Sequence, residues 1–377
     1  MWKIQLAELN YNHLEGEEVS KIISSRWLTM GEKTKEFETK FSKFIGSKVS
    51  SLAVSSGTAA LHLALLAGNI KKDDDVIVPA LTFIADANVV KLVGANPIAA
   101  DCQSIDFWNV SLESIKKVIT PNTKAIIIVH YAGYPCEMDD IVHFCKENNI
   151  FLIEDVAHAP GAEINGLKCG SFGDVGCFSF FSNKNLAVGE GGMLTTSSPE
   201  IFKRLQHLRS HGMSSLTLDR HKGRAATYDV LEPGLNYRID EIRAAIGCVQ
   251  LSKLQKGNAK RKILTERYIS NLKNSNVHVP FSPIIDKHIS AYHILPILLP
   301  KKVERKMVIE GLKMEGIQSS IHYLGLWDFS AYNNFFNDQD YPFTSEICKR
   351  ELTLPLFPGM NEDQVDTVTD ALLNILS

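Results

Sequence analysis

Short apolar runs alternate with stretches of helical spacing along the first half of the chain. The apolar runs have the length of strands, and the stretches between them repeat apolar side chains every three or four residues. The predicted strands cover 51–54, 76–78, 97–100, 125–129, 151–154, 175–180 and 193–195, and the predicted helices cover 14–25, 32–45, 59–67, 85–92 and 139–147. This alternation predicts an α/β fold whose seven-stranded, mainly parallel sheet is flanked by helices on both faces.

The pattern changes after residue 240. Residues 241–272 predict one long helix, or two helices with a break at Gly257. The elements predicted beyond it are a strand over 292–299 and helices over 305–315 and 363–376. We therefore predict a large domain over 1–245, which includes the N-terminal helix, and a smaller C-terminal α+β domain over 246–377.

The composition is that of a soluble globular protein. Of the 377 residues, 45% are hydrophobic and 22% are charged, and the net charge is −3. This balance gives no reason to expect a nucleic acid or an anionic membrane as a partner. The polar start of the chain lacks the apolar region of a signal peptide, no apolar run is long enough to span a membrane, and the seven cysteines form no C-x-x-C pair. These features predict a cytoplasmic protein.

Two histidine-containing features bear on metal and anion binding. His207 and His211 have the spacing of zinc ligands on a helix, but no Glu lies beside the first histidine and Gly212 indicates a helix end. We therefore predict no metal site. A run rich in Arg, His and Lys over 209–224 is either a solvated loop or a segment that binds a phosphate or carboxylate of the substrate.

Two segments near strand ends carry groups suited to a phosphorylated pyridine. Ser56, Gly57 and Thr58 lie between a strand and a helix, where backbone N–H groups and the helix dipole favour a phosphate. The alternative is a plain helix cap. Asp155 closes an apolar strand, and a carboxylate beside a pyridine nitrogen keeps the ring protonated. The alternative is an aspartate that caps the next helix. His158 follows, within reach of a ring oxygen.

A lysine and a pair of polar residues complete the candidate chemistry. Lys184 lies between an apolar strand and the Gly-Glu-Gly-Gly segment 189–192, a setting suited to a Schiff base because partial burial lowers the pKa of the amine. The alternative is a solvated surface lysine. Ser179 adds a hydroxyl for a phosphate. Asn236 and Arg238, just before the long helix, offer an amide and a guanidinium to anionic groups, or mark a helix start capped by Asp240.

Together these segments resemble the sugar aminotransferase branch of the fold-type I pyridoxal phosphate (PLP) enzymes, often called the DegT/DnrJ/StrS family. The resemblance runs nearly end to end. It rests on seven segments in this order: Trp27-Leu28-Thr29-Met30-Gly31, Ser56-Gly57-Thr58-Ala59-Ala60-Leu61, Val78-Pro79-Ala80-Leu81-Thr82-Phe83, Glu154-Asp155-Val156-Ala157-His158, Lys184 with Gly189-Glu190-Gly191-Gly192, Asn236-Tyr237-Arg238, and Leu354-Pro355-Leu356-Phe357-Pro358-Gly359.

The resemblance implies a role for each matched position. Lys184 would carry PLP as a Schiff base and Asp155 would pair with the pyridine nitrogen, which makes these two residues and His158 the catalytic candidates. The other residues implied to bind the cofactor are Ser56, Gly57, Thr58, Ser179, Phe83 stacked on the ring, and Asn236 from the other subunit of a homodimer with shared active sites. The residues implied to bind the substrate are Thr29, Gly31, Arg238, His322 and Tyr323. For His322 and Tyr323 the alternative is ordinary domain packing.

The implied activity is transfer of an amino group from L-glutamate to a keto-sugar, with pyridoxamine phosphate (PMP) as the intermediate form of the cofactor. A nucleotide-linked 4-keto-6-deoxy sugar, used for amino-sugar or surface-polysaccharide synthesis, is the expected acceptor. Relatives that dehydrate sugars have histidine in place of the lysine, so Lys184 favours transamination. The alternatives are a PLP-dependent dehydratase or lyase on the same scaffold, and a cofactor-binding regulatory protein without activity.

Overall fold

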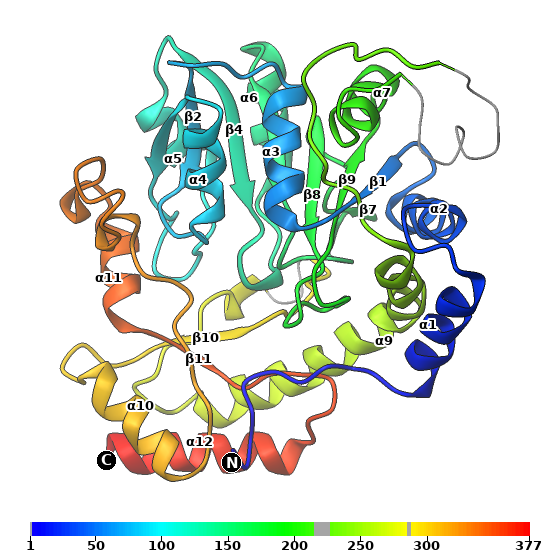
Figure 1. Ribbon diagram of the computed structural model, residues 1–377. Coiled ribbons are helices and arrows are strands. Elements are labelled where there is room, and N and C mark those ends of the chain that lie inside the picture. Colours follow the sequence, from blue (N-terminus) through cyan, green and yellow to red (C-terminus); the bar gives the residue numbers. More distant parts are fainter. Residues whose placement is uncertain (1, 215–226, 285–287) are drawn as a thin grey trace.

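The computed structural model describes residues 2–214, 227–284 and 288–377. A seven-stranded sheet lies at the centre of its upper part, in the order β1-β9-β8-β5-β4-β2-β3 (Figure 1). The strands are β1 (Ser50–Val54), β2 (Asp75–Pro79), β3 (Asn96–Ala100), β4 (Thr123–Val129), β5 (Phe151–Asp155), β8 (Val175–Ser179) and β9 (Gly192–Thr196). Every pairing is parallel except those of β9, which runs antiparallel to both β1 and β8. The predicted mainly parallel sheet is confirmed.

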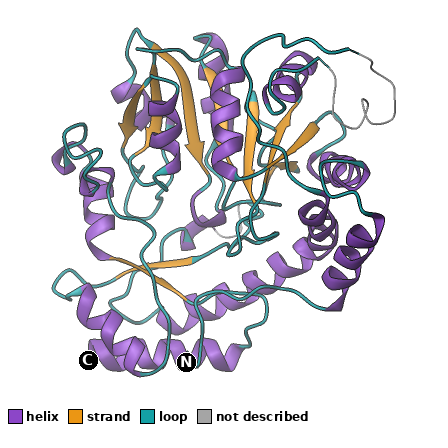
Figure 2. Ribbon diagram, in the orientation of Figure 1, coloured by secondary structure: helices purple, strands orange, loops and turns teal. Residues whose placement is uncertain are grey.

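Helices cover both faces of this sheet, because successive side chains of each strand point to opposite faces (Figure 2). The first face packs its apolar side chains, such as Ile127 and Ile153, against α3 (Gly57–Ala67), α4 (Ala85–Leu92) and α7 (Pro199–Leu208). On the second face, Ile126 and Ile128 pack against α5 (Leu112–Val118) and α6 (Met138–Glu147). At the β1-β9-β8 end of that face, the covering helices are α2 (Glu32–Ile45) and the first half of α9 (Glu241–Leu272).

The lower part of the molecule is built around the second half of α9. This helix is continuous through Gly257, so the single-helix alternative is confirmed. The elements that share its core are β10 (Leu295–Leu298), antiparallel to β11 (Glu351–Leu354), with α10 (Arg305–Met314), α11 (Pro342–Arg350) and α12 (Glu362–Leu376). The predicted boundary between residues 245 and 246 falls inside α9 and stays a prediction.

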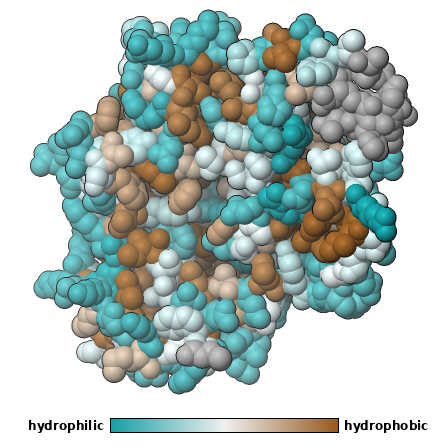
Figure 3. All heavy atoms as spheres, in the orientation of Figure 1, coloured by the Kyte–Doolittle hydropathy of each residue, from teal (hydrophilic) through white to brown (hydrophobic). Residues whose placement is uncertain are grey.

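The remaining elements are peripheral. Helix α1 (His13–Ser25) packs on α9, and β6 (Glu163–Ile164) and β7 (Leu167–Lys168) form a small hairpin. Both chain ends lie in the lower part (Figure 1). On the face shown in Figure 3, apolar side chains form separate patches among polar ones. Within the described ranges, no helix combines the length and apolar character needed to cross a bilayer.

Candidate active site

A cavity of about 340 Å³ opens at the carboxyl edge of the sheet, where β4, β5 and β8 end. This is the edge at which α/β proteins usually bind ligands. The connection from β8 to β9 and a segment from the lower part of the molecule also line it. The predicted residues that it brings together are Ser56, Gly57, Thr58, Phe83, Asp155, His158, Ser179, Lys184, His322 and Tyr323.

One wall of the cavity is the first turn of α3. The Ser56 hydroxyl oxygen accepts a hydrogen bond from the Ala59 N–H at 3.0 Å, so Ser56 does cap this helix. A Cβ added to Gly57 would lie 2.8 Å from Cβ of Ser179, so glycine allows the end of β8 to approach the helix. The helix N-terminus favours an anion, and Ser179 places a hydroxyl beside it. This wall suits a phosphate.

Lys184 lies in the connection of residues 180–191, which joins β8 directly to its antiparallel neighbour β9. The Lys184 N–H donates to the Phe181 carbonyl at 2.9 Å, which fixes the start of a turn. Burial lowers the pKa of the Lys184 amine to about 8, although the charge of Asp155 opposes this shift. More of the amine is therefore unprotonated near neutral pH than for an ordinary lysine, and this form is able to attack an aldehyde.

Asp155 is the last residue of β5 and is buried at the cavity. Burial raises the pKa of its carboxyl, while the hydrogen bond from the Ala157 N–H, 2.8 Å from Oδ1, and the charge of Lys184 favour the ionised form. The carboxyl therefore lies at the cavity, as predicted, and also accepts a hydrogen bond from the backbone that follows β5.

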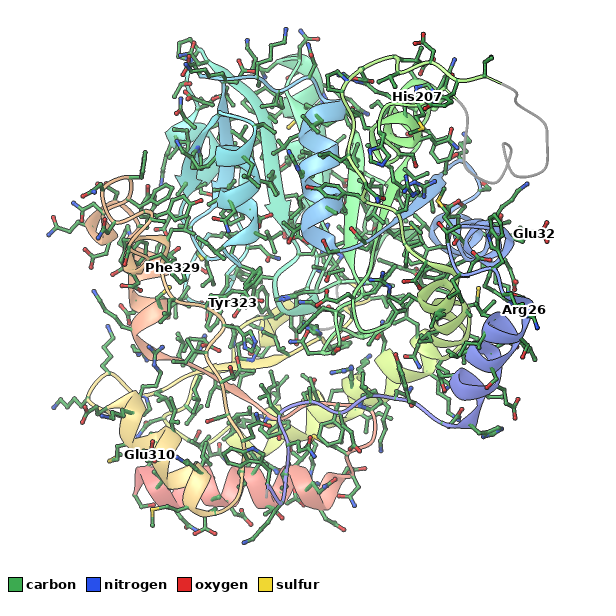
Figure 4. All side chains as sticks on the ribbon, in the orientation of Figure 1. Arg26, Glu32, His207, Glu310, Tyr323 and Phe329 are labelled. Atoms are coloured by element: carbon green, nitrogen blue, oxygen red, sulfur yellow. The ribbon has the colours of Figure 1, made fainter. Side chains whose placement is uncertain are left out.

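His158 and Tyr323 form a hydrogen-bonded pair. Nδ1 of His158 accepts from the Ala132 N–H at 3.2 Å, so in the neutral ring Nε2 carries the hydrogen and donates it to the Tyr323 hydroxyl at 2.9 Å. Burial and the charge of Lys184 hold the pKa of His158 well below its usual value, which keeps the ring neutral. The Tyr323 hydroxyl hydrogen is then left for a group in the cavity. Tyr323 lies between the upper and lower parts of the molecule (Figure 4).

Two residues of β11 position His322 and Tyr323. A carboxylate oxygen of Glu351 accepts from the His322 backbone N–H at 2.8 Å, and the other accepts from the Thr353 hydroxyl at 2.5 Å. The hydroxyl oxygen of Thr353 in turn accepts from Nδ1 of His322 at 2.9 Å. Burial raises the pKa of Glu351 to about 8. The sequence analysis did not identify Glu351 or Thr353, although the alternation of polar and apolar residues over 351–354 was a signal for a strand there.

A second network that the sequence analysis did not identify fixes the residue after the lysine. The Asn185 side-chain amide donates to the Ala291 carbonyl at 2.7 Å and to Oδ1 of Asn258, in α9, at 2.9 Å. Its Oδ1 then accepts from Nδ1 of His293 at 2.9 Å. The His293 ring lies 4.4 Å from that of His158, centroid to centroid. The lysine turn is thereby tied to α9.

Glu154 supports the end of β5 from the face opposite to that of Asp155. One carboxylate oxygen accepts from the N–H groups of Phe172 and Gly173, and the other from that of Gly170, each at 2.8 Å. His130 completes the network at 3.1 Å. Both oxygens of Glu154 are thus occupied by hydrogen bonds. Of the two acidic residues, only Asp155 faces the cavity.

Four predicted residues lie outside this cavity. Gly31 is the residue before α2 and donates its N–H to Glu241 at 2.9 Å, and Thr29, two residues earlier, is exposed. The main chain of Asn236 pairs with Ser210, and that of Arg238 pairs with Val54. Asp240 caps α9, as the alternative for this segment predicted. None of the four lines the cavity of its own chain.

The basic run over 209–224 is only partly described, since residues 215–226 lie outside the described ranges. Its first residue, Arg209, is buried and donates from one guanidinium nitrogen to Glu38 at 2.6 Å and to the Ala53 carbonyl at 2.7 Å. Arg209 is therefore committed to holding α2 against β1. His211 lies beyond the end of α7, which stops at Leu208.

The donor set of the cavity fits PLP. The first turn of α3 and Ser179 suit its phosphate, Lys184 its aldehyde and Asp155 its ring nitrogen, and the volume lies in the range of small-molecule sites. The side-chain oxygen of Asn183, also at the cavity, is buried without a partner among the described residues, so a polar group remains for a ligand.

Comparison with known proteins supports this fit. The model of the DegT/DnrJ/EryC1/StrS aminotransferase family matches residues 11–373. The chain belongs to this family. It is 35% identical to the spore coat polysaccharide biosynthesis protein SpsC of Bacillus subtilis, over 96% of this chain and 94% of SpsC. The structure of Spr1654 from Streptococcus pneumoniae in its PMP form superimposes with a TM-score of 0.91, at 29% identity and over 98% of both chains.

A third relative is PseC of Helicobacter pylori, an aminotransferase involved in the biosynthesis of pseudoaminic acid. It superimposes with a TM-score of 0.91 at 27% identity, over 99% of this chain and 98% of PseC. Spr1654 is also known in a PLP form. The chain is therefore a fold-type I, PLP-dependent aminotransferase of a sugar aminotransferase family that uses PLP and PMP, and the resemblance seen in the sequence is confirmed. The roles of individual residues stay predictions.

Proposed function

We propose that this aminotransferase moves an amino group from L-glutamate to a nucleotide-linked 4-keto-6-deoxy sugar, in the synthesis of an amino sugar for a surface polysaccharide. The observation that carries the proposal is the placement of Lys184 and Asp155 in one cavity with the α3 phosphate wall. SpsC and PseC act in polysaccharide and amino-sugar biosynthesis, which supports a sugar acceptor.

Each residue has a defined task in this proposal. When bound, PLP supplies an electron sink that lets a carbon next to the amino group lose a proton. Asp155 keeps the ring nitrogen protonated, and Phe83 covers a ring face. Lys184, whose pKa of about 8 lies near neutrality, moves the proton between the amino-bearing carbon of the substrate and the C4′ carbon of the cofactor. It does so in opposite directions in the two half-reactions. Tyr323, which accepts from His158, donates to a ring or substrate oxygen.

We further propose a homodimer in which Asn236 of one chain reaches the phosphate site of the other. Phe83 and Phe181 line the cavity yet are 55% and 45% exposed in the single chain. Tyr228, Val230 and Leu231 add exposed apolar surface close in sequence to Asn236. Burial of these side chains by a second copy would close the cavity on its open side. It would also bring Thr29, Gly31 and Arg238 of the second copy to the cavity. The proposed location is the cytoplasm, in keeping with the seven free, buried cysteines.

The two half-reactions provide the test. L-Glutamate added alone to the PLP-loaded protein should convert the visible absorbance to that of the PMP form and release one equivalent of 2-oxoglutarate. A nucleotide-linked 4-keto-6-deoxy sugar should then restore the PLP spectrum and yield an amino sugar, identified by mass spectrometry. Loss of water from the sugar without 2-oxoglutarate release would instead identify a dehydratase, and cofactor binding with neither reaction would favour a regulatory protein.

A further inference from the structure

Asp86 is a buried carboxyl directly behind the cavity wall. It lies in the first turn of α4, after Thr82, Phe83 and Ala85, which line the cavity. Its side chain is fully buried. Oδ2 is hydrogen-bonded to the Thr82 hydroxyl, and Oδ1 has no hydrogen-bond partner among the described residues. A carboxyl in this setting lacks the hydrogen bonds that would stabilise a full negative charge.

The titratable groups that Asp86 meets on neighbouring elements are mostly acidic or neutral. The charge of Asp155, at the end of β5, acts on Asp86. An ionised Asp86 would in turn act on Cys177 of β8 and on Tyr323 at the cavity. Burial first, and the charge of Asp155 second, raise the pKa of Asp86 well above its usual value. The start of α4 favours an anion, but by less than an unpaired buried charge costs.

Asp155 is better supplied than Asp86 with groups that stabilise an anion. It accepts a hydrogen bond from the Ala157 N–H, and the charges of Lys184 and His130 lower its pKa. Two buried carboxyls within electrostatic reach of each other do not both ionise readily, so the one with the better partners takes the charge. Asp155 is that residue, and Asp86 keeps the proton.

We propose that Asp86 and Asp155 form a carboxyl pair that carries a single negative charge at neutral pH, with Asp86 as the neutral member. Asp155 is then the charged member of the pair, at the proposed ring-nitrogen position, and Asp86 adds no second charge to the site. The role of the pair toward PLP rests on the proposed function, whereas the shared charge itself is a property of the chain.

The stability of the full chain, with and without PLP, tests the shared charge. The folded protein keeps a proton on Asp86 that the unfolded chain loses above a pH of about 4. Wild-type stability therefore falls as pH rises from there toward the raised pKa of folded Asp86. Asp86→Asn removes this loss. Its melting temperature should gain on that of wild type by about 2 °C or more between pH 4.5 and 7.5.

The same substitution is then compared in an Asp155→Asn background, which completes a double-mutant cycle. Without the charge of Asp155, the pKa of folded Asp86 is lower, so the gain from Asp86→Asn should stop rising at a lower pH in the Asp155→Asn background. A gain that does not change with pH, or one that stops rising at the same pH in both backgrounds, would overturn the proposal. Asp86→Ser is run in parallel, so that the pH profile is still obtained if the Asn variant fails to fold.

Cofactor affinity separates this proposal from the proposed function. Because a neutral amide replaces a neutral acid, Asp86→Asn should bind PLP within about threefold of wild type at pH 7, as measured by absorbance titration. A loss of PLP affinity of more than about tenfold, or 1.4 kcal/mol, would show that Asp86 is charged in the loaded protein and would contradict the proposal. If wild type itself binds no PLP, the proposed function fails, while the stability cycle still decides the carboxyl pair.

Discussion

The two walls of the cavity are built in different ways. The sheet wall consists of Ser56, Gly57, Asp155, Ser179 and Lys184, all within a few residues of a strand end. The C-terminal wall consists of His322 and Tyr323, which no strand of the large sheet carries. Glu351 and Thr353 of β11 hold them by side-chain hydrogen bonds. The sheet wall thus derives its geometry from the backbone, and the C-terminal wall from a few polar side chains.

This difference separates two functions. In the proposed function, the residues that would bind PLP lie on the sheet wall, and His322 and Tyr323, which would bind the sugar, lie on the wall held by β11. Changes to the sheet wall should therefore affect every substrate, and changes behind the C-terminal wall should affect stability and acceptor choice.

The largest expected effect is that of Lys184→Ala. Loss of the proton-transferring amine should reduce amino transfer by at least about 10⁴-fold. Steady-state release of 2-oxoglutarate measures the rate, and borohydride reduction followed by mass spectrometry shows whether PLP is attached to this side chain. Lys203→Ala, at an exposed position on α7, is the matched control and should retain full activity. Normal turnover by the Lys184 variant would refute the assignment.

A smaller effect is expected from Gly57→Ala. The added methyl carbon would lie 2.8 Å from Cβ of Ser179 and force α3 away from the end of β8. A strain of about 1–3 kcal/mol should weaken PLP binding by about 5–150-fold, measured by absorbance titration. Gly16→Ala in α1, where a Cβ meets nothing within 4 Å, should leave the affinity unchanged. Equal PLP affinities for the two variants would show that the first turn of α3 does not form part of the phosphate site.

The smallest effect is a change in the pH dependence of stability on replacing Glu351. The pKa of its carboxyl rises from 4.5 to about 8 in the folded protein, so the folded state retains a proton that the unfolded state loses. Stability should therefore fall as pH rises from about 4.5 to 8. Glu351→Gln should flatten this decline, so that its free energy of unfolding gains on that of wild type as pH rises from about 5 to 8.

The control for Glu351 is Thr353→Val, which removes the neighbouring hydroxyl without removing an ionisable group. It should lower the free energy of unfolding by a similar amount at every pH, as measured by urea denaturation. A pH profile for Glu351→Gln that parallels that of wild type would show that the carboxyl is already ionised in the folded protein.

Local patterns were sufficient for the sheet wall. The predicted helices 32–45 and 85–92 match α2 and α4, because apolar spacing within one element decides which face is buried. The strand-end motifs placed Ser56, Asp155 and Lys184 correctly at one edge, since parallel strands end together. The sequence did not predict that β9 lies between β1 and β8, because the order of strands depends on contacts distant in sequence.

The C-terminal wall was less predictable for the same reason. His322 and Tyr323 were identified through the resemblance, but Glu351, Asn185 and His293 act through partners that no local pattern relates to them. The sequence analysis did not identify Asp86. The charge of Asp155 reaches it only because β2 and β5 are brought into one sheet by β4.

The unbroken helix α9 links the upper and lower parts of the molecule. Its 32 residues form a rod about 48 Å long, with one end beneath the sheet and the other in the C-terminal core. Asn258, which holds the residue after Lys184, lies close to its midpoint. The turn that carries Lys184 is therefore anchored to the middle of one rigid element that both parts of the molecule share.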